Sequence, residues 1–182
     1  MRYKRAATGS RFFHNRLMKQ EISHREDRFV DLHHSPIGEL YLIFSGTRLT
    51  AIDFEKPGNA LPLRATKRST LFKKELDAYF DGRLKEFGQE TEFLSGTAFE
   101  RAVWLCLKEI PYGETRTYRW VAEKVGRPKA MRAVGQALAK NPLPIILPCH
   151  RVVESDGSLG GYSGGVEKKR RLLALEYYSS RR

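Results

Sequence analysis

Cysteine and long apolar runs are what this chain most lacks. Only Cys106 and Cys149 occur among 182 residues, which excludes the disulfide framework of a small secreted domain. An unpaired reactive thiol needs a reducing compartment, so we expect an intracellular protein, either cytoplasmic (associated with the nucleoid) or nuclear. No apolar run approaches the ~18–20 residues of a membrane-spanning helix. No apolar core follows the basic start of the chain, so we expect neither membrane association nor secretion.

Two common ligand-binding patterns are also missing. The run Gly160 to Gly165 lacks the Gly-Lys-Ser/Thr ending of a phosphate loop, which argues against nucleotide binding. Its glycines would instead let backbone amides approach a ligand closely, beside Tyr162 and Ser163. This run is therefore either the wall of a flat polar pocket or a loose surface loop. Zinc spacing is absent as well, so we interpret the four histidines before residue 35 as surface residues: His14, His24, His33 and His34.

Positive charge is abundant but unevenly distributed. The net charge is +12, and residues 1–28 carry eight Lys or Arg against three Asp or Glu. Residues 29–93 are nearly neutral, with nine against ten, whereas residues 94–182 carry sixteen against eight. The basic excess thus accompanies the half that holds Cys149. A polyanionic partner, most simply nucleic acid, is one hypothesis; a merely soluble basic surface is the other.

The pattern of apolar residues predicts an α+β (α/β) fold with two small domains after an extension. Residues 1–28 are polar and basic, and we expect a flexible or loosely docked extension. Residues 29–94 predict an N-terminal α/β scaffold domain with an antiparallel sheet and one helix. Its predicted strands span 29–34, 39–44 and 49–54, its helix spans 70–80, and 86–94 is a candidate further strand.

Residues 95–178 predict a mainly helical second domain. Thr97 and Glu100 have the spacing of a capping box and open a helix that continues to Ile110, with Cys106 on its buried stripe. Shorter helices at 118–125 and 129–140, separated by a tight turn, are typical of a helix-turn-helix. Gly135 and neighbouring alanines give the second of these a smooth face, suited to close approach by another helix or by a nucleic-acid groove. A last helix is predicted over 167–177, with Leu172, Leu173 and Leu175 buried.

A proline-framed apolar stretch, 142–148, leads to Cys149 and His150. We interpret it as a buried strand whose flanking prolines hold Cys149 in one place. A histidine beside a cysteine is the usual means of forming a reactive thiolate near neutral pH. The alternative is that Cys149 is a small buried hydrophobic residue. Glu176, in an apolar part of the last helix, is the candidate to orient His150.

Several motifs occur together and in order: Arg132-Ala133-Val134-Gly135, Asn141-Pro142, Pro148-Cys149-His150-Arg151-Val152, Tyr162-Ser163-Gly164-Gly165 and Leu172-Leu173-Ala174-Leu175-Glu176. With these motifs the chain resembles the O6-alkylguanine-DNA alkyltransferases. The resemblance is dense from about Thr97 to Glu176 and covers residues 29–94 only in outline. Ordered motifs of this kind are far more specific than any one of them.

The resemblance implies DNA repair by direct, irreversible transfer of an alkyl group from guanine O6 to Cys149, so that each molecule acts once. His150, a bridging water and Glu176 would then activate the thiol. Tyr118 would give a proton to the departing guanine, and Asn141 would join the recognition helix to the active-site stretch. The pocket for the base would be formed by Pro144, Val152, Gly161, Tyr162, Ser163 and Gly164.

The resemblance further implies a double-stranded DNA partner that carries alkylated guanine and is bound in the minor groove independently of sequence. Arg132 would fill the space that the flipped base leaves in the stack. The residues implied in DNA contact are Tyr118, Arg119, Arg127, Met131, Arg132, Gly135, Gln136 and Ser155. We expect a monomer with no cofactor. Some relatives bind zinc through N-terminal cysteines; with no cysteine before Cys106, we expect no metal.

Three alternatives stay open from the sequence alone. One is an alkyltransferase-like protein that binds damage without repairing it; such proteins carry tryptophan where this chain has Cys149. Another is a helix-turn-helix regulator with an incidental thiol, which would leave Tyr162 and Glu176 without a role. The third is a cysteine hydrolase, which would leave the helix-turn-helix unexplained.

Overall fold

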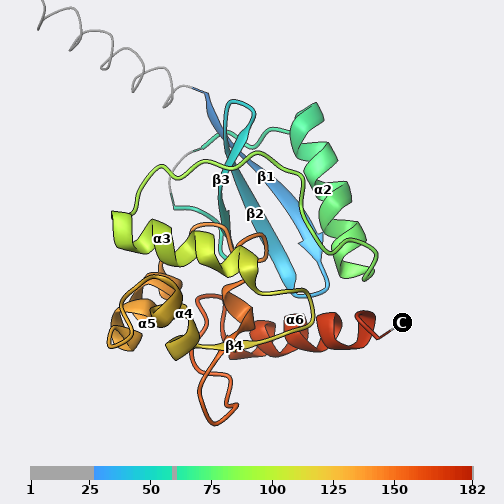
Figure 1. Cartoon of the computed structure of the whole chain (residues 1–182). Helices are drawn as coiled ribbons and strands as arrows, with labels where there is room; N and C mark the ends of the chain where they lie inside the picture. The colour runs from blue at the N-terminus through green and yellow to red at the C-terminus, as the bar shows by residue number, and fades with distance from the viewer. Residues whose placement is uncertain (1–26, 59–60, 182) are drawn as a thin grey trace, which may run out of the picture.

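The computed structural model describes residues 27–58 and 61–181. Our expectation for residues 1–28 therefore falls almost wholly outside the described residues. The described chain is an α+β fold, as predicted: a three-stranded antiparallel sheet lies beside helix α2, and the remaining helices gather at one end of that sheet (Figure 1). In the described ranges no helix is both long and apolar enough to cross a membrane.

The sheet is a meander in the order β1-β2-β3. Its strands are β1 (Arg28–Ser35), β2 (Gly38–Ser45) and β3 (Arg48–Asp53), within one residue of the predicted limits. Pairing of Ser35 with Gly38 closes the first hairpin, where Gly38 adopts a φ of 109° that favours glycine. Aromatic and branched residues face the core; Leu40, Leu42, Phe44 and Leu49 are fully buried. The sheet thus forms a rigid support for what packs against it.

Helix α2 (Lys67–Phe80) begins three residues earlier than the predicted 70–80. Thr66 and Ser69 form a reciprocal cap, in which serine takes the place of the usual Glu or Gln partner. Leu76 and Tyr79 on its inner face are fully buried, whereas Leu71 is 46% exposed. The helix consequently presents Tyr79, near its C-terminal end, to the interior.

The second half begins at the predicted capping box. Thr97 accepts a hydrogen bond from the Glu100 amide, and the Glu100 carboxylate accepts one from the Thr97 amide. The elements that follow are α3 (Ala98–Cys106), η1 (Leu107–Glu109), β4 (Arg116–Thr117), α4 (Tyr118–Lys124), α5 (Met131–Ala139), η2 (Cys149–Arg151), β5 (Val152–Val153) and α6 (Val166–Ser179). The predicted helix pair at 118–125 and 129–140 is therefore confirmed as α4 and α5, each slightly shorter. A hydrogen bond from Trp104 Nε1 to Ala137 O, 2.7 Å long, ties α3 to α5.

Two predicted strands are wrong. Residues 86–94 make only one isolated bridge, between Thr91 and Leu49, because the segment runs beside the sheet without extended pairing. Residues 142–148 form turns instead of a strand, and Ile145 has a φ of 77°, which no strand residue adopts. In addition, Leu173 and Leu175 are only partly buried, whereas Leu172 is fully buried as expected.

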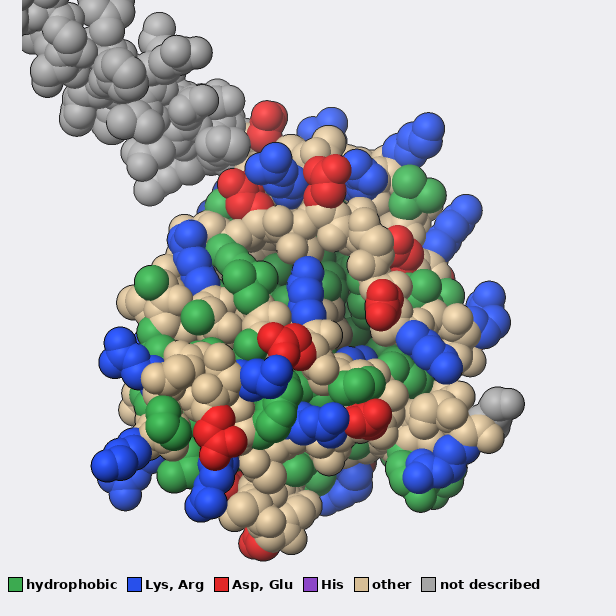
Figure 2. All heavy atoms as spheres, viewed as in Figure 1, with side chains coloured by type: hydrophobic (Ala, Val, Ile, Leu, Met, Phe, Trp, Pro, Cys, Tyr) green, Lys and Arg blue, Asp and Glu red, His purple; other side chains and the backbone are tan. Residues whose placement is uncertain are grey.

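Charges of both signs share the face seen in Figure 2. Lys and Arg side chains are spread over this face, with Asp and Glu side chains between them. Ion pairs among the described residues include Lys140 with Glu100 and Lys124 with Glu109. The basic excess of the second half therefore does not form a uniform patch on this face.

Candidate active site and DNA-facing cavity

Cys149 is held by a turn and not by a strand. It is the first residue of η2 and follows Pro148, whose ψ of 66° turns the chain. Asn141 braces this turn from within: its side chain donates to Leu147 O at 2.8 Å and accepts from the Leu143 amide at 3.0 Å. The Ile52 amide of β3 donates to Pro142 O at 2.8 Å, so the sheet supports the same stretch. Asn141 thus stabilises the segment between α5 and Cys149.

The Cys149 thiol is buried, with 5% of the residue exposed. Burial raises the pKa of Cys149 to about 11, although a hydrogen bond from Asn141 and the charge of Lys169 act in the opposite direction. The thiol is consequently neutral at rest at neutral pH. A reaction that needs the thiolate must therefore remove the proton as part of the step.

Lys169 is a fully buried cation beside Cys149. Its ammonium group donates to three backbone carbonyls, those of Val152 (2.6 Å), Leu159 and Gly161 (3.4 Å). Burial lowers the pKa of Lys169, whereas the nearby Cys149 and Glu154 would favour its charged form. This lysine ties the glycine run to the strand after Cys149. Because Lys169 is buried on these carbonyls, its ammonium group is not available to a phosphate at the surface.

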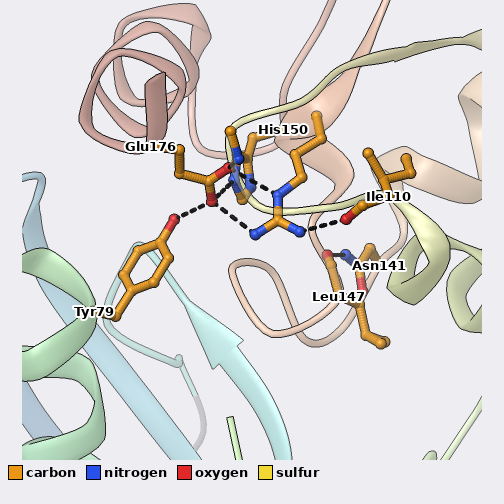
Figure 3. Close-up of polar contacts among 8 residues, drawn as sticks. Tyr79, Ile110, Asn141, Leu147, His150 and Glu176 are labelled. Carbon is orange, nitrogen blue, oxygen red and sulfur yellow. Dashed lines mark hydrogen bonds and ion pairs between the residues drawn. The ribbon is translucent and has the colours of Figure 1, made fainter. Parts of the chain in front are cut away.

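Glu176 and His150 form a closed network behind Cys149 (Figure 3). Both side chains are fully buried, and His150 Nε2 lies 2.9 Å from Glu176 Oε1. Arg151 donates to both carboxylate oxygens, from Nε at 2.8 Å and from Nη2 at 2.9 Å. We expected Glu176 to lie away from other charges; this was wrong, because the chain turns Arg151 back onto α6.

The network fixes the protonation states of its members. Burial opposes ionisation of Glu176, but the hydrogen bonds from His150 and Arg151 and the positive charge of Arg151 outweigh it and hold its pKa at about 2. Burial lowers the pKa of His150 despite its bond to Glu176, so the imidazole is neutral. A neutral ring that donates Nε2–H to the carboxylate leaves Nδ1 as an acceptor. His150 Nδ1 is buried and has no hydrogen-bond partner among the described residues, which suits a base.

In front of Cys149 lies a cavity of about 500 Å³. Its walls come from the start of α4, one face of α5, the loop after β5 and the glycine run. Its lining residues are Thr117, Tyr118, Arg119, Met131, Arg132, Gly135, Leu138, Ala139, Cys149, Glu154, Ser155, Gly161, Tyr162 and Ser163. The Tyr162 hydroxyl is buried and has no hydrogen-bond partner among the described residues.

Most predicted substrate and DNA residues meet in this cavity, but some do not. Pro144 and Val152 are buried behind it, and Gly164 packs against Phe54, where an added Cβ would lie 2.7 Å from the ring. Arg127 and Gln136 are exposed and lie outside the lining set. Among the remaining residues, Tyr118 stands at the N-terminus of α4, and parallel pairing of β4 with β5 brings it beside the Cys149 segment. Burial raises the pKa of Tyr118, so its hydroxyl keeps its proton.

Three residues of the site were missed: Tyr79, Arg151 and Lys169. The Tyr79 hydroxyl donates to Glu176 Oε1 at 2.7 Å, from a helix ninety-seven positions earlier. No local pattern could have identified Tyr79, because a tyrosine on an apolar helical stripe is the signature of core packing. Arg151 adjoins the Cys-His pair and could have been considered as a charge partner for Glu176. Across the described residues, no group of three or more His, Cys, Asp or Glu is placed to hold a metal ion.

Comparison with known families divides the chain in two. Residues 29–93 match the ribonuclease-like domain of 6-O-methylguanine DNA methyltransferase, and residues 98–178 match the DNA-binding domain of the same family. Among curated proteins, the methylated-DNA–protein-cysteine methyltransferase of Methanosarcina barkeri is 42% identical over 153 residues, covering 81% of this chain and 96% of the relative. The corresponding protein of Mycobacterium leprae is 46% identical, over 78% of this chain and 88% of the relative.

Solved structures give the same result. The crystal structure of Mycobacterium tuberculosis O6-methylguanine methyltransferase superposes with a TM-score of 0.77 at 41% identity, covering 84% of this chain and 94% of that chain. A crystal structure of Mycobacterium tuberculosis OGT in complex with DNA gives 0.77 at 41% identity, over 83% and 94%. The similarity therefore extends over both halves of the chain and not only over the residues around Cys149.

Proposed function

The chain belongs to the 6-O-methylguanine-DNA methyltransferase family, and from this premise we propose that Cys149 is the residue that takes up the alkyl group. The protein is a methylated-DNA–protein-cysteine methyltransferase that repairs alkylated DNA by direct transfer to its own cysteine. In the proposed step, Cys149 Sγ attacks the alkyl carbon and forms a C–S bond. The bond from that carbon to guanine O6 breaks, and its electron pair leaves with the base.

The observation that carries the assignment is the position of Cys149 between an open cavity and a closed acid–base network. Cys106, the other thiol, has no such surroundings. Cys106 is the last residue of α3 and is not among the residues that line the cavity. A thioether does not hydrolyse, so each molecule acts once.

The proton of the Cys149 thiol passes to His150 Nδ1 through a bridging water. Glu176 accepts the Nε2–H bond and stabilises the imidazolium that forms, as in thiol hydrolases. The neutral resting thiol and the neutral imidazole are compatible with this order of events. Lys169 adds positive charge near the developing thiolate.

The departing guanine receives its proton from the Tyr118 hydroxyl, which faces the cavity and is neutral at rest. The base occupies the space between Tyr118 and Tyr162. Ser163 and the backbone of Gly161 supply polar contacts to its edge, in keeping with their place in the lining.

The DNA partner lies across α5. Arg132 and Met131 are exposed at its start and line the cavity mouth. A base must leave the duplex to reach a buried thiol, which costs a few kcal/mol of stacking and pairing. Arg132 occupies the vacated place in the stack, and the small-residue face at Gly135 lies in the minor groove, whose degenerate code suits scanning independent of sequence. We expect the protein to act as a monomer, inside the cell, without a cofactor.

Mass spectrometry after incubation with a duplex that contains alkylguanine tests the proposal. We expect one alkyl adduct per chain, on the peptide that holds Cys149, and no turnover beyond stoichiometry. Cys106→Ala is the matched control and should give the same adduct, whereas Cys149→Ser should give none. An adduct on Cys106, or none on the wild type, would overturn the assignment.

The alternative readings are not favoured. A damage-binding protein without transfer activity would not need a cysteine at position 149. A regulator or a hydrolase would not share both matched domains with the methyltransferases.

A further inference from the structure

The hydroxyl of Tyr79 reaches the active-site carboxylate from the other half of the chain. Tyr79 lies near the C-terminal end of α2, and its Oη is 2.7 Å from Glu176 Oε1. Both side chains are fully buried. Figure 3 shows the Tyr79 ring approaching Glu176 from the α2 side, opposite the labelled Asn141 and Leu147. The sheet-and-helix half is thus in direct contact with the catalytic network.

Glu176 Oε1 accepts hydrogen bonds from three different residues. Besides Tyr79, it accepts from Arg151 Nη2 at 2.9 Å and lies 2.9 Å from His150 Nε2. The other oxygen, Oε2, accepts from Arg151 Nε and from the Gly113 amide at 3.2 Å. The oxygen that faces the histidine is therefore the one that Tyr79 also binds.

The position of Tyr79 is fixed by a cluster of aromatic rings. Its ring contacts Phe80 at 5.3 Å, Phe87 at 5.4 Å and Tyr112 at 6.0 Å between centroids. These contacts surround the buried ring and restrict its movement. Burial, followed by the charge of Glu176, holds the pKa of Tyr79 well above its usual range, so the hydroxyl keeps the proton it donates.

We propose that Tyr79 is a positioning residue for alkyl transfer: by donating to Glu176 Oε1, it sets the orientation and the basicity of the carboxylate that serves His150. The inference rests on the proposed roles of Cys149 and His150. It gives the N-terminal half a part in the chemical step, beyond that of a scaffold.

The physical reason is that Tyr79 and His150 donate to the same carboxylate oxygen, Glu176 Oε1. A hydrogen bond to a carboxylate withdraws negative charge from the accepting oxygen, and bonds to charged groups are about twice as strong as neutral ones. Without the Tyr79 donor, Oε1 would carry more charge and hold an imidazolium more firmly. The pKa of His150 would rise, and less of the neutral base would be present near pH 7.

The test compares Tyr79→Phe with Tyr112→Phe in single-turnover transfer across a range of pH. Tyr112 belongs to the same ring cluster, but its hydroxyl is not among the described donors to Glu176. Rates are measured with a duplex and with free O6-benzylguanine, and are normalised to the fraction of protein that forms an adduct. Normalisation removes any effect of a smaller folded fraction.

For Tyr79→Phe we expect transfer on both substrates to slow by about 10-fold on the acidic limb of the pH profile, the effect of losing one charged hydrogen bond, and by less at pH 7. The midpoint of the acidic limb of the pH profile should move to higher pH. Tyr112→Phe should keep the wild-type rate and midpoint. An unchanged midpoint, or slowing on the duplex alone, would overturn the inference, because a purely structural role cannot shift the titration of His150.

A second measurement covers the case in which Tyr79→Phe does not fold. Incorporation of 3-fluorotyrosine at position 79 keeps the ring and makes the hydroxyl a stronger donor. The midpoint should then move to lower pH, and an unchanged midpoint would again contradict the inference. If the wild type forms no Cys149 adduct, the proposed function fails; if it does and these midpoints do not move, only the role of Tyr79 fails.

Discussion

The side chains on the two sides of Cys149 differ in burial and in pairing. Behind it, His150, Arg151 and Glu176 are buried, paired and braced by Tyr79 from the other half of the chain. In front, Arg119, Met131 and Arg132 are exposed around an open cavity. A buried charge is costly unless it is paired, so the rear network must be complete before the substrate arrives. Side chains that meet DNA must instead exchange water for the partner, and they remain accessible.

This contrast predicts two kinds of defect. Changes behind Cys149 should slow transfer from any substrate and should also destabilise the fold. Changes in front should slow transfer from duplex DNA and leave the rate of transfer from a small free base unchanged. Each of the following substitutions tests one side of this division.

Glu176→Gln should have the largest effect. It removes the negative charge that stabilises a protonated His150 and replaces one acceptor oxygen with a donor NH2 group. Arg151 is then a buried, poorly paired cation, which costs about 3 kcal/mol of unfolding free energy. Loss of an effective general base slows reactions by about 100-fold or more, and we expect this with the duplex and with free O6-benzylguanine. Glu167→Gln, an exposed carboxylate on the same helix, is the control and should resemble the wild type.

The same variant should change the acid stability. The pKa of Glu176 is lowered from 4.5 to about 2 in the fold, so its stabilising contribution is present above pH 4.5 and is lost as the pH falls towards 2. Glu176→Gln should therefore flatten the loss of stability over that range, as measured by urea unfolding at several pH values. A wild-type pH dependence in the variant would mean that Glu176 is not the titrating group.

Arg132→Ala should have an intermediate and selective effect. If Arg132 supports the extruded state of the base, its loss should slow transfer from the duplex by about 10-fold or more, since extrusion costs a few kcal/mol. Transfer from free O6-benzylguanine and the thermal midpoint should stay unchanged. Arg83→Ala, an exposed cation in the turn after α2, is the control for net charge. Equal slowing on both substrates would mean that Arg132 acts in the alkyl-transfer step itself, which would contradict the proposed difference between the two sides of Cys149.

Gly135→Ala should have the smallest effect, with opposite signs for stability and activity. An added Cβ would meet only Tyr118 Cε1 at 3.8 Å, an ordinary contact. Replacing a helical glycine with alanine should therefore stabilise the fold by about 0.5–1 kcal/mol. If the α5 face lies in the minor groove, transfer from the duplex should slow by a few-fold without a change for the free base. An undiminished duplex rate would show that this glycine does not face DNA.

Much of the helical half was predictable because its signals are local. These signals depend on residues a few positions apart. They are the capping box at Thr97 and Glu100, the turn between α4 and α5, and the ordered motifs around Cys149. The sheet was predictable for the same reason, since alternation and hairpin turns act at short range. The stretch at 142–148 was predicted wrongly because a buried apolar run does not reveal whether it is extended, and Ile145 turns it.

The sequence by itself determined the fold class, the family resemblance and the candidates Cys149, His150 and Glu176, because each is carried by residue type and order. Only the tertiary structure decided which other residues contact these three. It placed Tyr79 and Arg151 on Glu176, buried Lys169 beside Cys149, and separated Pro144, Val152 and Gly164 from the cavity lining. The reason is physical: a hydrogen bond between residues ninety-seven positions apart leaves no periodicity in the chain, and it exists only once both helices are packed.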